Sequence, residues 1–331
     1  MFAAIVGIAS HTLSPDEAAL FRARPPAGVI LFGRNVGDPD QLRVLCAALR
    51  EVLPPGAVIA VDQEGGRVAR LRPPGWRAHP PAAAIGGLHQ RDPAAGERAA
   101  YLTGALIGLD CAASGLDMAC APVLDLRIDS ASDVIGDRSY GSDPRDVAAL
   151  AKCMAAGLMA AGVLPVGKHA PGHGRAQVDS HHALPVIPAG VSLDDDIEAF
   201  TLCSALPWMM TAHLLYERID AERPGTLSPA VIGGVIRERI GFAGVLVSDD
   251  LAMKALDGEP WALAAAALAA GCDIALHCSG VLDESRSVLS AVPSIGAACA
   301  ARMTAARAAV AGRRTSLEAE ALAVERGLLL A

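Results

Sequence analysis

Short, almost wholly apolar runs alternate along the chain with longer stretches of helical character, and this alternation constrains the fold more than any other feature. There are eight such runs, each bounded by Gly, Pro or a charged residue, and most contain the β-branched residues typical of strands. They span residues 3–9, 28–32, 58–62, 118–124, 165–169, 208–213, 245–249 and 273–278. Strands that are apolar throughout are typical of a parallel sheet covered by helices.

The stretches between the runs carry helix signals. Ser228 followed by Pro229, for example, supplies an N-cap and a residue suited to the first helical position. The sequence predicts helices at 15–23, 39–52, 95–114, 143–161, 193–205, 229–240 and 259–270. Strand-then-helix units repeated in this way predict an α/β fold, a closed (β/α)8 TIM barrel. An open doubly wound sheet is the alternative that the same pattern allows.

The chain shows no Ser/Gly linker and no change of composition before residue 293, so we expect a single domain. The predicted barrel covers residues 1–292. A C-terminal helical segment, 293–331, is predicted to pack on it, because the tail from Gly296 is rich in Ala, Arg and Glu. The barrel is favoured because polar residues end most of the apolar runs, at the rim where barrels build active sites. These residues are Asp62, Asp125, Lys168, His169, His213, Asp249, Asp250 and His277.

Charge and composition exclude several classes of protein. The net charge of −8 argues against nucleic-acid binding, which needs a basic surface. No apolar run approaches the roughly 18 residues of a membrane span, and the apolar start lacks the positive region of a signal peptide. The eight cysteines are dispersed without a Cys-x-x-Cys pair, which favours free thiols in a reducing compartment. The sequence carries no signal for a particular oligomeric state.

The densest polar stretch, residues 168–182, holds four of the nine histidines. A proline and two glycines within it exclude a helix, so we expect an irregular loop after the strand. Asp179 and His181 are two residues apart in this loop. A carboxylate that accepts a hydrogen bond from imidazole Nδ1 fixes the tautomer and directs Nε2 at a substrate. Such a unit can give a proton to a leaving oxygen and later take one from water. A solvated loop with a chance histidine cluster is the alternative.

Another run ends in two adjacent acids, Asp249 and Asp250. Successive side chains at a strand end point in different directions, so we expect the two to differ in role. One can project into the rim as a nucleophile or metal ligand, and the other can cap the following helix. A pair of exposed acids at a helix start is the alternative.

Two further stretches supply polar residues at the rim. Asp62 ends a run and is followed by a Gly pair that allows a tight turn, from which Arg70 could reach back over the rim. Asp62 could bind ligand hydroxyls bidentately. Arg138 lies in a second turn, 135–141. Each stretch is a weak signal alone, because surface Asp–Arg pairs are usually just solvated.

Together these four stretches resemble the β-N-acetylhexosaminidases of glycoside hydrolase family 3. The resemblance spans roughly residues 1–280, and the matching segments follow the family's order. They are residues 61–68, 136–140, Lys168-His169 with Pro171-Gly172-His173-Gly174 and Asp179-Ser180-His181, and 248–251 with Met253. The histidine-rich element is highly specific and distinguishes this branch from its β-glucosidase relatives. Ala170 departs from the pattern, because an aromatic residue is usual there.

The resemblance implies a one-domain barrel that releases terminal N-acetylglucosamine with retention of anomeric configuration. Asp249 matches the family's nucleophile, His181 its acid/base and Asp179 the partner of that histidine. The positions that hold the sugar match Asp62, Arg70, Arg138, Lys168 and His169. No metal or other cofactor is implied. The resemblance also implies a cytoplasmic, cell-wall-recycling enzyme that cleaves N-acetylglucosamine from 1,6-anhydro-N-acetylmuramic acid peptides.

The chemistry of the residues agrees with this assignment. Retaining glycosidases usually use two carboxyls about 5–5.5 Å apart, and here the Asp179–His181 unit takes the place of the second carboxyl. An unperturbed imidazole has a pKa of about 6.5 and exchanges protons near neutral pH. A histidine also avoids a second carboxylate beside Asp249, which would raise the pKa of the nucleophile.

Three alternatives stay open. Phosphate could replace water as the acceptor, which makes the enzyme a phosphorylase. A metal-dependent hydrolase could draw ligands from a set of rim residues, although these lack helical metal-ligand spacing. That set is His169, His173, His181, His213 and Asp249. The third alternative is a sugar-binding barrel without catalysis.

Overall fold

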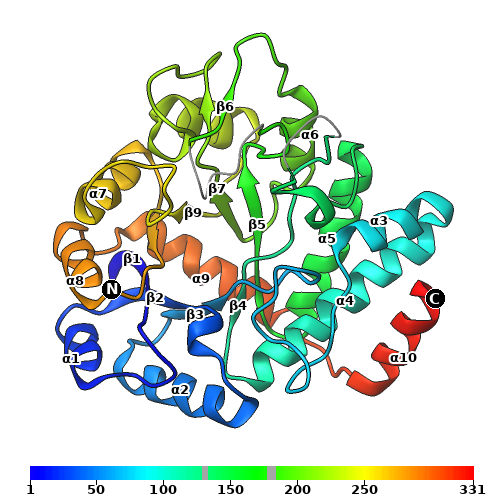
Figure 1. Ribbon diagram of the computed structural model, residues 1–331, viewed down its shortest axis with the longest axis horizontal. Helices are drawn as coiled ribbons and strands as arrows, with labels where there is room; N and C mark the ends of the chain where they lie inside the picture. Colours follow the sequence, from blue (N-terminus) through cyan, green and yellow to red (C-terminus); the bar gives the residue numbers. More distant parts are fainter. Residues whose placement is uncertain (129–132, 177–183) are drawn as a thin grey trace.

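The structure is a computed structural model of the 331-residue chain that describes residues 1–128, 133–176 and 184–331. Within these residues, eight parallel strands close into a barrel surrounded by helices (Figure 1). The chain therefore adopts the predicted (β/α)8 TIM barrel, and the open sheet is excluded.

The barrel strands all fall on the predicted apolar runs. They are β1 (Phe2–Gly7), β2 (Pro26–Leu31), β3 (Val58–Val61), β4 (Met118–Ala119), β5 (Leu164–Ala170), β7 (Trp208–Thr211), β9 (Val245–Asp250) and β10 (Ile274–His277). Their order around the barrel is β1-β10-β9-β7-β5-β4-β3-β2. Pairing of Ala4 with Ala275 and of Val6 with His277 joins the first strand to the last. A separate short sheet pairs β6 (Val186–Ile187) with β8 (Leu215–Tyr216).

Every predicted helix is present, and α3 and α8 occur in addition. The helices are α1 (Pro15–Ala23), α2 (Pro39–Val52), α3 (Ala82–Arg91), α4 (Pro93–Ala113), α5 (Pro144–Ala160), α6 (Asp194–Leu202), α7 (Pro260–Ala270), α8 (Leu282–Ala291), α9 (Ala297–Ala311) and α10 (Ala319–Leu330). The helix predicted at 229–240 is a π-helix, Ala230–Arg239, and the Ser228 hydroxyl accepts a hydrogen bond from the Val231 N–H at its start.

Helices α4 and α5 pack closely because glycines face the partner backbone. A Cβ on Gly104 would lie 2.0 Å from the Met154 carbonyl oxygen, and one on Gly157 would lie 2.1 Å from that of Tyr101. Any larger residue at either position would force the helices apart. This contact fixes the outer layer beside β4 and β5, the second of which leads into the histidine-rich loop.

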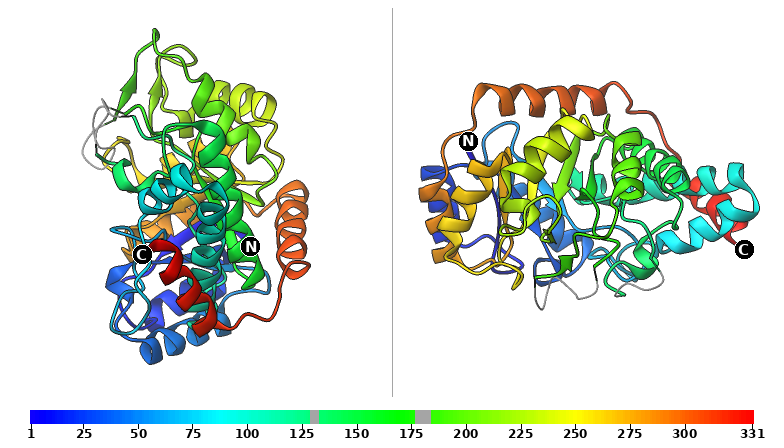
Figure 2. Two further views of the ribbon diagram at one scale, coloured as in Figure 1. Left: turned by 90° about the vertical axis from the view of Figure 1, so that its right-hand side faces the viewer. Right: turned by 90° about the horizontal axis from the view of Figure 1, so that it is seen from above.

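The last two helices pack on different parts of the molecule (Figure 2). Helix α9 covers the amino ends of the strands, where Arg302 pairs with Asp273, the residue before β10. Helix α10 lies along α4, and Arg98 donates to both carboxylate oxygens of Glu325 at 2.7 and 2.8 Å. The division of the chain at residue 292 stays a prediction.

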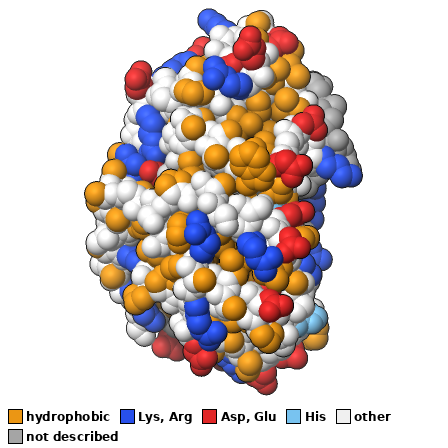
Figure 3. Space-filling model, turned by 90° about the vertical axis from the view of Figure 1, so that its left-hand side faces the viewer, with side chains coloured by type: hydrophobic (Ala, Val, Ile, Leu, Met, Phe, Trp, Pro, Cys, Tyr) orange, Lys and Arg blue, Asp and Glu red, His pale blue; other side chains and the backbone are white. Residues whose placement is uncertain are grey.

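The helix predicted at 259–270 is apolar from residue 260 onward, but only one face of α7 is buried. Leu263, Ala264 and Ala267 are buried against the barrel, whereas Trp261 is 51% exposed. Hydrophobic side chains accordingly gather on the face of the molecule shown in Figure 3. A helix on a barrel buries only the stripe that faces the strands, even when its whole sequence is apolar.

All eight cysteines are free thiols, and all except Cys153 are buried. Among the helices of the described ranges, none has the length and apolar character needed to cross a bilayer.

Candidate active site

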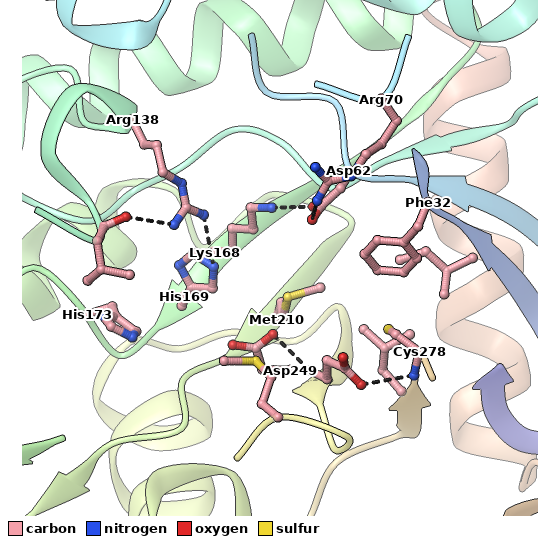
Figure 4. Close-up of a pocket in the computed structure, with 15 residues that line it drawn as sticks. Phe32, Asp62, Arg70, Arg138, Lys168, His169, His173, Met210, Asp249 and Cys278 are labelled. Atoms are coloured by element: carbon pink, nitrogen blue, oxygen red, sulfur yellow. Dashed lines mark hydrogen bonds and ion pairs between the residues drawn. The ribbon is translucent and has the colours of Figure 1, made fainter. Parts of the chain in front are cut away.

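A cavity opens at the carboxyl ends of the barrel strands (Figure 4). It is lined by every candidate site residue that the structure describes, namely Asp62, Arg70, Arg138, Lys168, His169 and Asp249. The two other candidates, Asp179 and His181, lie outside the described residues.

Asp62 directly follows β3 and pairs with two cationic side chains of the cavity. Lys168 Nζ donates to Asp62 Oδ1 at 2.7 Å, and Arg70 Nη2 donates to Oδ2 at 3.1 Å. Burial alone would raise the pKa of Asp62, but the Lys168 ammonium and the Arg70 guanidinium outweigh it and hold that pKa far below its usual range. Asp62 is therefore ionised, and Arg70 reaches back over the rim as the sequence predicts.

Glu64 also lies in this cluster, although no role is predicted for it from the sequence. Arg138 donates to both Glu64 carboxylate oxygens at 2.8 Å, and Lys168 Nζ lies 2.6 Å from Oε1. Lys168 is 2% exposed, so its ammonium is held between two carboxylates away from water. The position of Glu64 two residues beyond Asp62, on the same turn, is the sequence feature that could have indicated a place in the cluster.

His169 is oriented by Asp125, a second residue without a predicted role. The Asp125 carboxylate accepts from His169 Nδ1 at 2.6 Å and from the His173 backbone N–H at 2.7 Å. His169 Nε2 is left facing the cavity, 3.5 Å from Arg138 Nη2. Burial would raise the pKa of Asp125, but the His169 imidazole more than offsets this and lowers it. Asp125 directly follows the fourth apolar run, and this position is the sequence feature that could have indicated a role in the site.

The turn that follows Asp62 requires glycine. Gly65 and Gly66 have φ angles of 109° and 55°, in the left-handed region that disfavours other residues. A Cβ on Gly65 would also lie 2.4 Å from the Pro80 carbonyl oxygen. The Gly pair thus lets the turn rest directly on the segment 79–81, which fixes the direction in which Glu64 points.

The two acids at the end of β9 have different surroundings. Asp249 lies at the cavity with its carboxylate toward the space below His169 (Figure 4). Asp250 Oδ1 instead accepts from the backbone N–H groups of Ala252 and Cys278, each at 2.9 Å. Both acids border the cavity, but the Asp250 carboxylate is used to tie the end of β9 to the segment after β10.

A chain of hydrogen bonds fixes the backbone at Asp249. Its N–H donates to Thr211 Oγ1 at 3.2 Å, and Thr211 Oγ1 lies 2.7 Å from Thr226 Oγ1. His213 Nδ1 lies 2.8 Å from the same Thr226 hydroxyl, while Nε2 contacts the Asp250 carbonyl oxygen at 2.9 Å. Both ring nitrogens of His213 are thus used to hold the end of β9.

The charge state of Asp249 follows from its neighbours. Burial alone would raise its pKa, but the imidazoles of His213 and His169 and the Asp250 N–H together lower it below its usual range. Burial raises the pKa of Asp250. Asp249 is therefore ionised at the cavity, where its carboxylate can attack an electrophilic carbon, beside a cluster of donors and acceptors suited to the hydroxyls of a sugar.

Within the described ranges, no group of three or more His, Cys, Asp or Glu side chains is arranged to hold a metal ion. His213, one of the ligands considered for a metal-dependent hydrolase, is hydrogen-bonded through both ring nitrogens.

Comparison with known proteins agrees with the site. A family model described as the glycosyl hydrolase family 3 N-terminal domain matches residues 10–311. The chain is 41% identical over 281 residues to a β-hexosaminidase of Bordetella parapertussis, covering 83% of this chain and 79% of that protein. It is 37% identical to a β-hexosaminidase of Xylella fastidiosa, with 98% and 92% covered.

A solved structure is similar over the same length. NagZ from Neisseria gonorrhoeae in complex with N-trifluoroacetyl-D-glucosamine matches with a TM-score of 0.86 and 32% identity, over 99% of this chain and 97% of that one. The family match and these identities extend over the strands that carry Asp62, Lys168 and Asp249. The chain therefore belongs to glycosyl hydrolase family 3, and it is a glycoside hydrolase of the β-N-acetylhexosaminidase type.

Proposed function

We propose that the enzyme is a retaining exo-β-N-acetylglucosaminidase that forms a covalent sugar intermediate on Asp249. The observation that carries the proposal is the place of Asp249, ionised and at the cavity beside the cluster of Asp62, Lys168 and Arg138. In the first step the Asp249 carboxylate attacks the anomeric carbon, the glycosidic bond breaks, and the leaving oxygen takes a proton from His181.

In the second step His181 takes a proton from water, which attacks the same carbon and frees the sugar from Asp249. Two displacements restore the original anomeric configuration. Asp179 orients the His181 imidazole and stabilises its charged form. The cavity cluster holds the sugar, with Asp62 as acceptor and Lys168 and Arg138 as donors.

We further propose that the substrate is a muropeptide, N-acetylglucosamine linked to 1,6-anhydro-N-acetylmuramic acid with a peptide stem, processed in the cytoplasm. The similarity to NagZ, which was solved with an N-acylated glucosamine, supports the sugar at the cleaved end. Comparing the turnover of substrates with and without the peptide shows how much of the stem the enzyme recognises.

Turnover of a chromogenic N-acetylglucosaminide against the matching glucoside tests the assignment. We expect the first to be cleaved and the second to be a poor substrate. Asp179→Asn should lower turnover while leaving binding nearly intact. A large loss of binding would make Asp179 a sugar ligand rather than the partner of His181.

Phosphorolysis and metal dependence are tested on the wild-type enzyme. Product analysis in phosphate buffer should give free sugar, whereas a sugar phosphate would identify a phosphorylase. Because the proposed steps use only side chains and water, activity should survive prolonged treatment with EDTA. Loss of activity that added metal restores would favour a metal-dependent hydrolase.

A further inference from the structure

Arg326 on the C-terminal helix α10 is buried against the segment that precedes helix α3, and that segment contacts the turn carrying Glu64. Arg326 is 8% exposed, its Nη1 lies 2.8 Å from His79 Nδ1, and its Nη2 donates to the Ala78 carbonyl oxygen at 3.0 Å. Burying a guanidinium costs free energy unless its donors are satisfied, so the site of Arg326 is defined by these two acceptors.

The contact fixes the protonation of His79. A guanidinium can only donate, so His79 Nδ1 must accept, and Nε2 must carry the hydrogen. Nε2 lies 3.1 Å from Asp110 Oδ2 on α4, and Arg77 pairs with the other Asp110 oxygen. Burial lowers the pKa of His79, with the nearby Arg326 acting in the same direction and Asp110 in the opposite one. His79 is thus a neutral imidazole that links α10 to α4.

His79 also contacts the turn of the active site through its backbone. Its carbonyl oxygen accepts from the Gly66 N–H at 2.9 Å, and the carbonyl oxygen of Pro80 would lie 2.4 Å from a Cβ on Gly65. Movement of the segment 78–81 would therefore move the turn, and Glu64 with it.

We propose that Arg326 is a positioning residue for the sugar site, which holds the segment 78–81 under the Gly65–Gly66 turn and so keeps Glu64 against Lys168. The inference rests on the proposed role of this cluster in binding N-acetylglucosamine. Arg326 itself is remote from the cavity, so it acts on substrate binding only through the turn.

A second ion pair on α10 provides a matched control. Arg98 and Glu325 form a bidentate pair on the surface, where their side chains are 44% and 43% exposed. Such exposed pairs contribute little to stability. Glu325 is next to Arg326 in the chain, but its partner in this pair, Arg98, lies on α4. Loss of the pair loosens α10 without removing a contact to His79.

The test compares Arg326→Met, Arg326→Lys and Glu325→Gln in the full chain, at a temperature where thermal unfolding shows each to be folded. We expect Arg326→Met to lower kcat/KM for an N-acetylglucosaminide about tenfold, the factor for one lost hydrogen bond, mainly through KM. Arg326→Lys, which keeps the charge and one donor contact, should restore part of the loss. Glu325→Gln should stay within about twofold of wild type.

A double-mutant cycle tests whether Arg326 acts on substrate binding through Glu64. If Arg326 acts through Glu64, Arg326→Met should have little further effect in a Glu64→Gln background, whereas independent sites give additive losses. An unchanged kcat/KM in folded Arg326→Met, an equal loss in Glu325→Gln, or full additivity would overturn the inference. Failure of both Arg326 variants to fold would also overturn it, because Arg326 would then serve stability alone. A wild-type enzyme inactive on the substrate would instead overturn the proposed function.

Discussion

The backbone N–H of Asp250 donates to the carboxylate of Asp249 at 2.8 Å, so the position of one acid affects the charge of the other. The Asp250 side chain is occupied by two backbone N–H groups, and this holds the end of β9 in place. Its own N–H is thereby aimed at Asp249 and helps to keep that carboxylate ionised. One acid holds the strand end, and the other lies ionised at the cavity.

Thr226 should matter for catalysis although it does not line the cavity. Thr226→Val removes the hydroxyl between Thr211, which holds the Asp249 N–H, and His213, which holds the Asp250 carbonyl oxygen. We expect kcat to fall about tenfold, with a smaller change in KM, because the nucleophile loses its exact position while the sugar ligands remain. Steady-state kinetics on a chromogenic substrate gives both constants.

Thr103→Val is the matched control for this variant. Thr103 is buried in α4, and its hydroxyl has no hydrogen-bond partner among the described residues. Replacing it with valine should leave kcat unchanged and leave the free energy of unfolding unchanged or higher. If Thr226→Val behaves in the same way, the hydrogen-bond chain does not support Asp249.

Glu64→Gln should weaken substrate binding. The variant keeps the shape of the side chain but removes the charge that both Arg138 and Lys168 contact. We expect KM to rise at least about tenfold, because hydrogen bonds between charged groups contribute about 1.5–3 kcal/mol. Glu198→Gln, which breaks an exposed pair with Arg145, should leave KM unchanged. Equal KM values in the two variants would show that Glu64 does not position the cations.

Lys168→Met should be destabilising as well as inactive. It leaves Asp62 and Glu64 without the ammonium that lies between them. Removing one partner of a buried ion pair costs about 3–5 kcal/mol. Urea unfolding at pH 7 measures this loss, which should shrink at acidic pH as the carboxylates become protonated. A free energy of unfolding equal to wild type at pH 7 would contradict the buried pairing.

Stability should decline toward acidic pH partly through His173. Burial lowers the pKa of His173 to about 4, and the neighbouring His169 adds to this shift. The unfolded chain therefore binds a proton that the folded one does not between pH 6.5 and 4. The contribution is fully present above pH 6.5 and is lost as the pH falls toward 4. In His173→Gln, the free energy of unfolding should fall less steeply across this range; an unchanged slope would show that His173 is protonated in the fold.

The strands were predictable because each lies on an apolar run, most of these runs end in a polar residue, and a parallel barrel buries both faces of its strands. Helix α3 was not predictable from the sequence, because its cap residue Pro81 offers no side-chain acceptor and the helix contains Gly86 and Gly87. A segment without a start signal and with two glycines does not have the pattern of a helix.

The site was predictable where motif and strand end coincide, as at Asp62, Lys168 and Asp249. The supporting residues were not, because their contacts join distant parts of the chain: Asp125 meets His169 across 44 residues, and Arg326 meets His79 across 247. Periodicity and spacing describe neighbours in sequence, whereas these contacts depend on the closed barrel.

The most direct measurement uses a fluorinated N-acetylglucosaminide, which slows release of the sugar from the enzyme. After incubation and proteolysis, mass spectrometry of the peptide that contains both acids locates any covalent sugar. We expect the sugar on Asp249. A sugar on Asp250, or no adduct while the substrate is still turned over, would contradict Asp249 as the nucleophile.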